Sequence, residues 1–182
     1  EELVYLLDNS DATVVVYEAG FAGSVAKVRD RLPNVREWIE LADGSAGNAF
    51  SVSYEQIVGA GTDQRLDIER APTDLLFMYT GGTTGMPKAA VISHSKWIKA
   101  YGGFGLSGLG LKNHDVLYMT LPLYHSNAVL VSWSSVLCGG AALALRRKFS
   151  ASAFWKDVAR YQATSFCYIG ELCRYLLNLP EC

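Results

Sequence analysis

The sequence predicts an α/β fold in which helices cover both faces of a largely parallel sheet. Half of the 182 residues are hydrophobic, which is enough to bury a sizeable core. Short apolar runs typical of strands alternate along the chain with segments of helical periodicity. Because a helix-length segment separates successive strands, parallel pairing is favoured, and ligands are expected at the loops beyond strand ends.

In the first third of the chain, two helices and two strands are expected to alternate. A helix is expected over residues 1–8, followed by a β-branched strand over 13–17. An amphipathic helix over 23–32 ends before Pro33, and a second strand covers 35–41.

A loop and a short capped helix follow. Residues 43–51 are rich in Gly, Ser and Asn and form a loop. Ser53 is placed to cap a helix over 54–61, which ends at its glycines. Residues 61–73 are a polar connection.

The centre of the chain carries two apolar runs separated by a Gly/Thr loop. Residues 75–80 are expected to be a buried strand and residues 88–93 a second strand. Either Ser93 or Ser95 caps the next helix, which is expected to end in a glycine-rich segment with glycines at 102, 103, 105, 108 and 110.

The last third continues the alternation of strands and helices. The helix over 126–140 ends in a glycine cap, and the one over 150–162 is amphipathic. The expected elements, in order, are strand 116–124, helix 126–140, strand 141–147, helix 150–162, strand 165–169 and helix 171–179.

The composition argues against several classes of protein. The formal charge is −2 and the basic residues are scattered, so no nucleic-acid partner is indicated. Four cysteines in apolar surroundings, with no CxxC pair, indicate neither zinc nor a disulfide framework and fit a reducing cytosol. The chain begins without Met or a targeting pattern, so an internal fragment is expected.

One uncharged segment, Met119 to Leu145, is long enough to be considered as a membrane span. Pro122, several serines and Gly139-Gly140 divide it, however, and a strand, a buried helix and a strand are expected instead. Peripheral contact with a membrane stays open, so the expected location is cytoplasmic or peripheral to a membrane.

The loop between the two central strands carries the chemistry. Its sequence, TGGTTGMPK from Thr80 to Lys88, combines glycines that let backbone approach an anion, three hydroxyl donors and one cation. In a kinase or GTPase P-loop the lysine follows the last glycine directly and a helix comes next; here Pro87 intervenes and a strand follows. A plain Gly/Thr hairpin turn is the other interpretation.

TGGTTGMPK resembles the (S/T)xGTTGxPK signature of the adenylate-forming superfamily of acyl-CoA synthetases, luciferases and peptide-synthetase adenylation domains. Three later segments, LPLYHSNA, RKFSASAFW and YIGELCRYLLNLP, resemble the very-long-chain acyl-CoA synthetase and fatty-acid-transport-protein branch. The resemblance implies that the chain is part of the large N-terminal domain, with a portion of a βα subdomain over 1–60 and the phosphate loop and acyl pocket over 71–182.

The resemblance also implies a reaction. ATP and a fatty acid would give acyl-AMP and pyrophosphate, and coenzyme A would then displace AMP. The loop residues would hold the ATP phosphates, through hydroxyl groups, backbone N–H groups and one ammonium group. These residues are Thr80, Gly81, Gly82, Thr83, Thr84, Gly85 and Lys88.

The acyl pocket is assigned by the same resemblance. Tyr124 would shield the substrate carboxylate and His125 would sit beside the reacting oxygens as the catalytic residue; a strand end with a core histidine is the alternative. Tyr168 and Gly170 would line the acyl tunnel, or form a tight turn before a helix. His94 and His114 are expected to be structural.

The resemblance implies that a Mg²⁺-binding Glu, a ribose-binding Asp, a hinge and a catalytic Lys lie on a C-terminal domain well downstream of this segment, so none of them is expected within it. The fragment alone is therefore expected to be inactive. Two alternatives remain for the whole protein: an aryl or bile-acid-type ligase of the same superfamily, and a non-catalytic lipid-uptake or lipid-binding protein.

Overall fold

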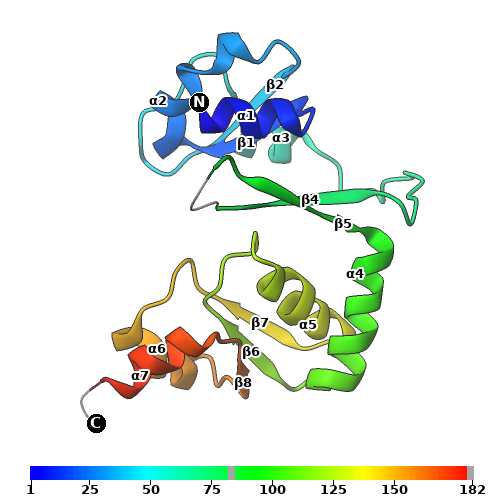
Figure 1. The fold of residues 1–182 in the computed structure, drawn as a ribbon, viewed down its shortest axis with the longest axis vertical. Helices are drawn as coiled ribbons and strands as arrows, with labels where there is room; N and C mark the ends of the chain where they lie inside the picture. Colours follow the sequence, from blue (N-terminus) through cyan, green and yellow to red (C-terminus); the bar gives the residue numbers. More distant parts are fainter. Residues whose placement is uncertain (82–84, 180–182) are drawn as a thin grey trace. The chain divides into compact units, whose positions relative to one another are not determined.

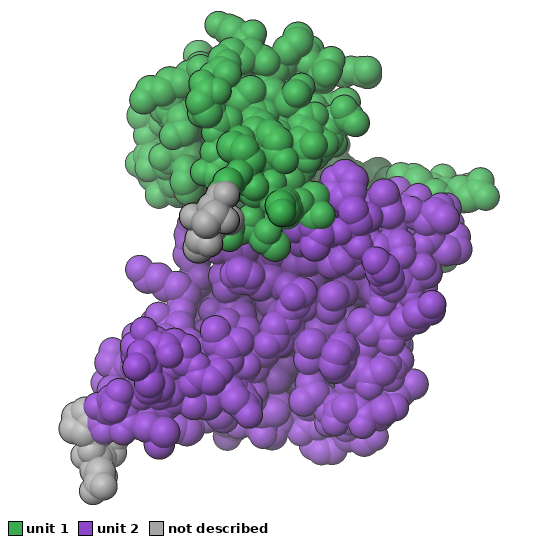
Figure 2. Space-filling model, in the orientation of Figure 1, with its two compact units in different colours: residues 1–69, 79–89 green, residues 70–78, 90–182 purple. Residues whose placement is uncertain are grey.

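The computed structural model describes residues 1–81 and 85–179. It divides into two compact units, which Figure 2 shows in different colours: residues 1–69 with 79–89, and residues 70–78 with 90–182. Three residues of the predicted phosphate loop, Gly82, Thr83 and Thr84, lie outside the described residues.

The first unit is built on a three-stranded parallel sheet in the order β1-β2-β3, of which Figure 1 labels β1 and β2. Val16 lies opposite Ile39, and Ile39 lies opposite Val52. The elements of this unit are α1 (Glu2–Asn9), β1 (Val14–Glu18), the 3₁₀ turn η1 (Ala19–Phe21), α2 (Ala22–Ala26), the 3₁₀ turn η2 (Arg29–Arg31), β2 (Glu37–Leu41), β3 (Val52–Ser53) and α3 (Tyr54–Ala60).

The predicted helix over 23–32 is shorter than expected, because α2 ends at Ala26 and a separate 3₁₀ turn follows. Its apolar residues Val25, Val28 and Leu32 are nevertheless buried, and they pack with Trp38 in one core. Spacings of three and four residues fit both helix types, so the periodicity identified the buried face and not the kind of helix.

Serine side chains cap two helices as the sequence suggested. Ser53 Oγ accepts a hydrogen bond from the Gln56 N–H at 3.4 Å at the start of α3. Ser93 Oγ accepts from the Lys96 N–H at 3.3 Å at the start of α4 (His94–Ala100), which makes Ser93, and not Ser95, the cap residue.

The central strands β4 (Leu75–Thr80) and β5 (Lys88–Ser93) pair as a two-stranded sheet. The prediction that 75–80 is a buried strand is wrong for this chain: Leu75, Leu76 and Phe77 are 56%, 43% and 40% exposed, and Met78 alone among the six is buried. The physical reason is that Leu75, Leu76 and Phe77 belong to none of the hydrophobic core clusters of the described residues, so no layer of side chains covers them.

The glycine-rich segment ends its helix, at the last of the predicted glycines. Helix α4 continues as a π-helix, η3 (Tyr101–Leu109), and stops at Gly110, whose φ is +58°. Gly105 has a packing role: a Cβ there would lie 2.5 Å from Cys138 Cβ. The missing side chain thus lets η3 approach the neighbouring helix closely.

The predicted helix over 126–140 is present as a π-helix, η4 (Asn127–Trp133), followed by α5 (Ser134–Gly139), with Gly140 at φ +64° as the cap. Its buried serines are satisfied by the helix itself: Ser134 Oγ donates to the Val129 carbonyl at 3.3 Å and Ser135 Oγ to the Val131 carbonyl at 2.6 Å. Within the described residues, no helix has the length and apolarity needed to cross a membrane.

The second unit is built on a parallel sheet in the order β7-β6-β8. Its strands are β6 (Val116–Met119), β7 (Ala142–Leu145) and β8 (Ser165–Phe166), and its remaining helices are α6 (Ala151–Arg160) and α7 (Gly170–Leu177). The first strand ends five residues earlier than the predicted 116–124, because the chain turns after Met119.

Successive residues of β6 point to opposite faces of this sheet. Leu117 packs with Val136 of α5, and Met119 packs with Ala128 of η4. Tyr118 contacts Phe154 of α6, with ring centroids 5.2 Å apart. Helices therefore cover both faces of the sheet, as the sequence predicted.

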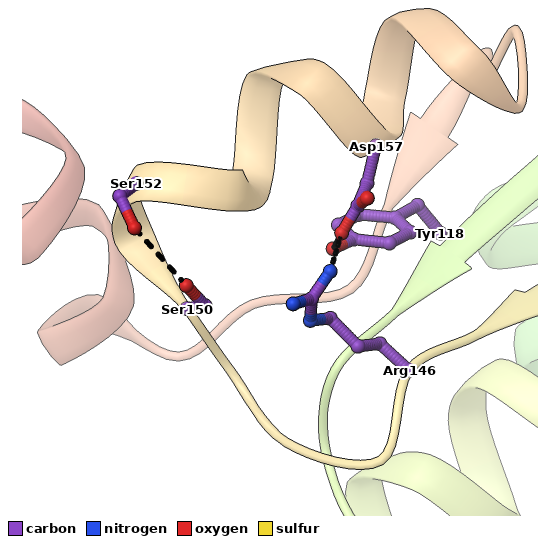
Figure 3. A network of polar contacts seen from close by, with 5 residues as sticks. All are labelled: Tyr118, Arg146, Ser150, Ser152 and Asp157. Carbon is purple, nitrogen blue, oxygen red and sulfur yellow. Dashed lines mark hydrogen bonds and ion pairs between the residues drawn. The ribbon is translucent and has the colours of Figure 1, made fainter.

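A polar network joins α6 to the sheet (Figure 3). The Tyr118 hydroxyl donates a 2.8 Å hydrogen bond to Asp157 Oδ2, and Arg146, which follows β7, forms an ion pair with the same oxygen. Burial, followed by the hydrogen bond to Asp157, raises the pKa of Tyr118 to about 12. The hydrogen bond from Tyr118 holds the pKa of Asp157 below its ordinary value, with Arg146 adding to the effect.

Candidate functional site: a phosphate loop and an acyl-pocket corner

The predicted phosphate loop joins β4 to β5, as expected from the sequence. Its base is closed by the Thr80 hydroxyl, which donates to the Lys88 carbonyl at 3.2 Å. Pro87 is buried beside it. Tyr79, which precedes Thr80 in β4, is held by a 2.7 Å hydrogen bond from its hydroxyl to Asn9 Oδ1 at the end of α1. The two ends of the loop are thus fixed by local contacts.

The groups predicted to meet phosphate are exposed at these ends. The side chains of Thr80 and Lys88 lie on the surface, and within residues 1–81 and 85–179 no carboxylate forms an ion pair with Lys88. The ammonium group is therefore available to an anion. Thr80 already has a backbone acceptor, so its hydroxyl needs to change partner to donate to phosphate.

The two described glycines of the loop leave open space beside the backbone. A Cβ at Gly81 or Gly85 would meet no atom within 4 Å. Gly85 has a φ of +155°, which side-chain-bearing residues rarely adopt. A ligand can therefore approach the backbone at both positions.

Tyr124 and His125 lie in the turn between β6 and η4, not at a strand end. Tyr124 is 70% exposed, and its ring centroid is 4.9 Å from that of His125. The His125 N–H donates to the Pro122 carbonyl at 3.0 Å, and the His125 carbonyl accepts from Val129 at 3.1 Å. His125 is exposed, and among the described residues its imidazole nitrogens have no hydrogen-bond partner.

Tyr168 and Gly170 flank the start of α7. Tyr168 is exposed, and its ring lies 5.8 Å from that of Phe166. Gly170 is the first residue of α7, and a Cβ there would meet nothing within 4 Å. The corner is open, as an acyl-binding role requires, although a turn before a helix would have the same geometry.

A cavity of about 150 Å³ in the second unit includes Tyr168 and residues that the sequence did not single out. Cys167 Sγ donates to Asn127 Oδ1 at 3.2 Å, and burial raises the pKa of this thiol. Asn127 lies two residues after His125, and this proximity in the sequence could have suggested that Asn127 belongs to the same region of the site. The lining residues are Leu109, Leu117, Asn127, Val131, Ser132, Phe166, Cys167 and Tyr168.

The remaining histidines have structural positions. The His94 N–H donates to the Asp74 carbonyl at 2.9 Å at the start of α4, and His114 lies in the turn before β6. In the described part of the chain, no group of three His, Cys, Asp or Glu side chains is arranged to hold a metal ion. Cys138, Cys167 and Cys173 are free thiols.

The predicted site residues thus form two sets. Thr80, Gly81, Gly85 and Lys88 belong to the first unit, whereas Tyr124, His125, Tyr168 and Gly170 belong to the second. The structure brings the ends of the phosphate loop together in one unit and pairs the rings of Tyr124 and His125 in the other.

A family model described as AMP-binding enzyme matches residues 1–182, the whole chain. The chain belongs to the AMP-binding enzyme family. This confirms the superfamily inferred from TGGTTGMPK.

Relatives of this AMP-binding chain lie in the expected branch. The medium/long-chain-fatty-acid–CoA ligase FadD6 of Mycobacterium tuberculosis is 40% identical over 99% of the chain and 29% of its own length. Long-chain fatty acid transport protein 1 of Rattus norvegicus is 35% identical over 99% of the chain and 28% of its own length. The chain therefore spans less than a third of the relatives that it matches.

Solved structures confirm the fold of this AMP-binding chain. The N-terminal domain of FACL13 from Mycobacterium tuberculosis, in an inhibitor-bound crystal structure, aligns with a TM-score of 0.84 at 24% identity over 99% of the chain and 43% of its own. The anthranilate CoA ligase AuaEII, in complex with anthranoyl-AMP, aligns with a TM-score of 0.80 at 20% identity over 91% of the chain and 32% of its own.

Proposed function

We propose that the full-length protein is an ATP-dependent fatty acyl-CoA synthetase that converts a long- or very-long-chain fatty acid to acyl-AMP and then to acyl-CoA. The observation that carries this proposal is the β4–β5 loop. It combines an exposed Lys88 ammonium group with open backbone at Gly81 and Gly85. That set of groups suits a polyphosphate.

In the proposed reaction the loop holds the β- and γ-phosphates while the fatty-acid carboxylate attacks the α-phosphorus. Lys88 offsets the negative charge of the departing pyrophosphate, and the Thr80 hydroxyl exchanges the Lys88 carbonyl for a phosphate oxygen. The glycines contribute backbone N–H donors. Gly82, Thr83 and Thr84 are assigned the same role from the family motif.

The acyl side of the proposed site consists of the turn that holds Tyr124 and His125 and the corner at Tyr168 and Gly170. His125 has free ring nitrogens in the described structure and is assigned to the reacting oxygens. Tyr124 shields the carboxylate from water, and the open space at Gly170 accommodates the chain. The roles of Tyr124 and His125 are proposed from the family motif and from the exposure of their side chains.

The names of the relatives support fatty acids as the substrate class, since they are a fatty-acid CoA ligase and a fatty acid transport protein. An aryl acid is the second candidate, because one structural neighbour is an anthranilate CoA ligase. A non-catalytic lipid-uptake protein is the third, because several relatives are named for transport.

The chain supplies part of the proposed site. Its described residues provide no cluster of metal ligands, so the Mg²⁺ that accompanies ATP is assigned to a ligand elsewhere in the protein. Coenzyme A is assigned as the second substrate from the family. The chain alone is predicted to be inactive because the groups for both half-reactions have to be held together.

A carboxylic-acid panel tests the proposed function. The full-length protein, with ATP, Mg²⁺ and coenzyme A, is expected to release pyrophosphate and form acyl-CoA with long-chain fatty acids in preference to aryl and bile acids. Preference for an aryl or bile acid would favour another ligase of the family. Absence of pyrophosphate release with every acid would favour the non-catalytic protein.

A further inference from the structure

The charge of the chain is distributed unevenly. Residues 146–179 carry six of its sixteen Lys and Arg residues but two of its eighteen Asp and Glu residues. Both of those acids are paired, Asp157 with Arg146 and Glu171 with Arg174. The last part of the described chain is therefore locally cationic in a protein whose net charge is negative.

Helix α6 carries two of these cations, Lys156 and Arg160, on one side. Its exposed residues recur at intervals of three and four, which places them on a single helical face. This face, called the α6 outer face below, contains one indole, two cations and no acid. It consists of Ser152, Trp155, Lys156, Ala159 and Arg160.

The acid of α6 is held on the opposite side. Figure 3 shows Asp157 pointing from the helix toward Tyr118 and Arg146, and its side chain is 13% exposed. The Tyr118 hydroxyl and the Arg146 guanidinium both bind this carboxylate, and among the described residues it forms no ion pair with Lys156 or Arg160, although its charge interacts with that of Arg160. The outer face itself therefore carries two cations and no carboxylate.

The aromatic residues of this surface are exposed beside the cations. Trp155 is 50% exposed, although its neighbour Phe154 is buried. Tyr161, just after the helix, is also exposed, with the Arg160 guanidinium 5.3 Å from its ring centroid. Lys148, before the helix, is a further exposed cation.

We propose that the α6 outer face docks on an anionic phospholipid surface, with Trp155 at the level of the headgroups and Lys156 and Arg160 against lipid phosphates. Indole and tyrosine rings favour the membrane interface, and long cationic side chains reach the headgroups from a helix lying flat on it. The small residues Ser152 and Ala159 let the helix approach closely. Nucleic acid is less suited, because binding of single strands uses several aromatic side chains along a cationic groove, and this helical face carries one indole.

Sedimentation with lipid vesicles tests this proposal in the full-length protein. Binding is expected to vesicles of phosphatidylcholine mixed with phosphatidylserine, to be weak to phosphatidylcholine alone, and to fall as salt rises. Lys156→Glu with Arg160→Glu should weaken binding at least about 20-fold, since each cation near an anionic surface contributes about fivefold. The matched control, Arg65→Glu with Arg70→Glu, makes the same charge change in the 61–73 connection and should leave binding near that of the wild type.

A fluorescence measurement reports the indole directly. Vesicles with brominated acyl chains should quench part of the wild-type tryptophan emission, and Trp155→Phe should abolish that quenching. Unchanged quenching in Trp155→Phe, or equal loss of binding in both charge-reversed variants, would overturn the proposal. Displacement from vesicles by single-stranded RNA, with RNA binding insensitive to Trp155→Phe, would overturn it in favour of a nucleic-acid surface.

The proposal is independent of the function proposed above. Pyrophosphate release with a water-soluble acid substrate, measured without vesicles, should be the same in the Lys156→Glu, Arg160→Glu variant and the wild type. Loss of that activity together with vesicle binding would show that the substitutions disturb the fold and would overturn the assignment to a docking face.

Discussion

The hydroxyl of Tyr118 donates a 2.8 Å hydrogen bond to Asp157, which links the central strand of the β7-β6-β8 sheet to helix α6. The same carboxylate pairs with Arg146 after β7. Strand β6, the residue after β7 and helix α6 thus meet at one oxygen, and the contact fixes which side of α6 faces outward.

Replacing Tyr118 with Phe is expected to destabilise the fold by about 1 to 2 kcal/mol, because the ring stays in place and one hydrogen bond to a carboxylate is lost. Urea unfolding of the full-length protein measures the change. Tyr79→Phe, which removes an exposed hydrogen bond to Asn9, is the matched control and should cost less. Equal effects of the two variants would contradict a special role for the Tyr118 contact.

Asp157 should make stability depend on pH in the acid range. Its pKa is lowered in the folded state, first by the hydrogen bond from Tyr118, so its contribution is complete above the ordinary aspartate pKa of about 4 and is lost as pH falls through the folded pKa. The difference in unfolding free energy between wild type and Asp157→Asn should therefore shrink below about pH 4. A difference that is constant down to the acid unfolding of the protein would contradict this account.

Gly105 should tolerate no side chain. A Cβ there would lie 2.5 Å from Cys138 Cβ, so Gly105→Ala is expected to cost about 1 to 3 kcal/mol through overpacking between η3 and α5. At Gly103, in the same π-helix, a Cβ would meet no atom within 4 Å. Gly103→Ala is thus the control, with a neutral or stabilising effect in thermal unfolding.

The glycines of 101–110 also illustrate what the sequence could not specify. Their number predicted the end of a helix, because glycine is a poor helix former, and the helix does end at one of them, Gly110. The pattern did not show that the earlier glycines lie inside a π-helix, where Gly105 packs closely on Cys138, because a local pattern contains no information about tertiary contacts. The same limit explains why the continuous helix of η4 and α5 was predicted without its π-helical first part.

Other parts of the fold followed directly from local chemistry. Ser53 caps α3 because its hydroxyl can reach the Gln56 N–H, and Val25, Val28 and Leu32 are buried because they share one helical side. The two apolar runs on either side of the motif correctly predicted the strands β4 and β5 that the loop connects. These patterns did not identify Asn127, whose contact with Cys167 depends on β8 lying next to β6.

A substitution at Gly170 tests whether the corner at the start of α7 binds the acyl chain or is a plain turn. Gly170→Leu introduces a side chain into open space, so stability is expected to change by no more than about 0.5 kcal/mol. If the corner lines the acyl tunnel, kcat/KM for long-chain acids should fall severalfold relative to short-chain acids in a chain-length series. Parallel changes for all chain lengths would identify the corner as a turn.

The proposed function depends above all on binding of the ATP phosphates by the β4–β5 loop during activation of the acid. The most direct test measures the two half-reactions of the full-length protein separately, for wild type, Lys88→Ala and the control Lys112→Ala, which removes an exposed lysine from the turn before β6. Loss of a charge-assisted contact of about 1.5 to 3 kcal/mol predicts that Lys88→Ala slows fatty-acid-dependent ATP–pyrophosphate exchange by about 10- to 100-fold. Transfer of the acyl group from supplied acyl-AMP to coenzyme A should change much less, and Lys112→Ala should change neither step. Equal slowing of both half-reactions by Lys88→Ala, or no slowing of the exchange, would contradict the account.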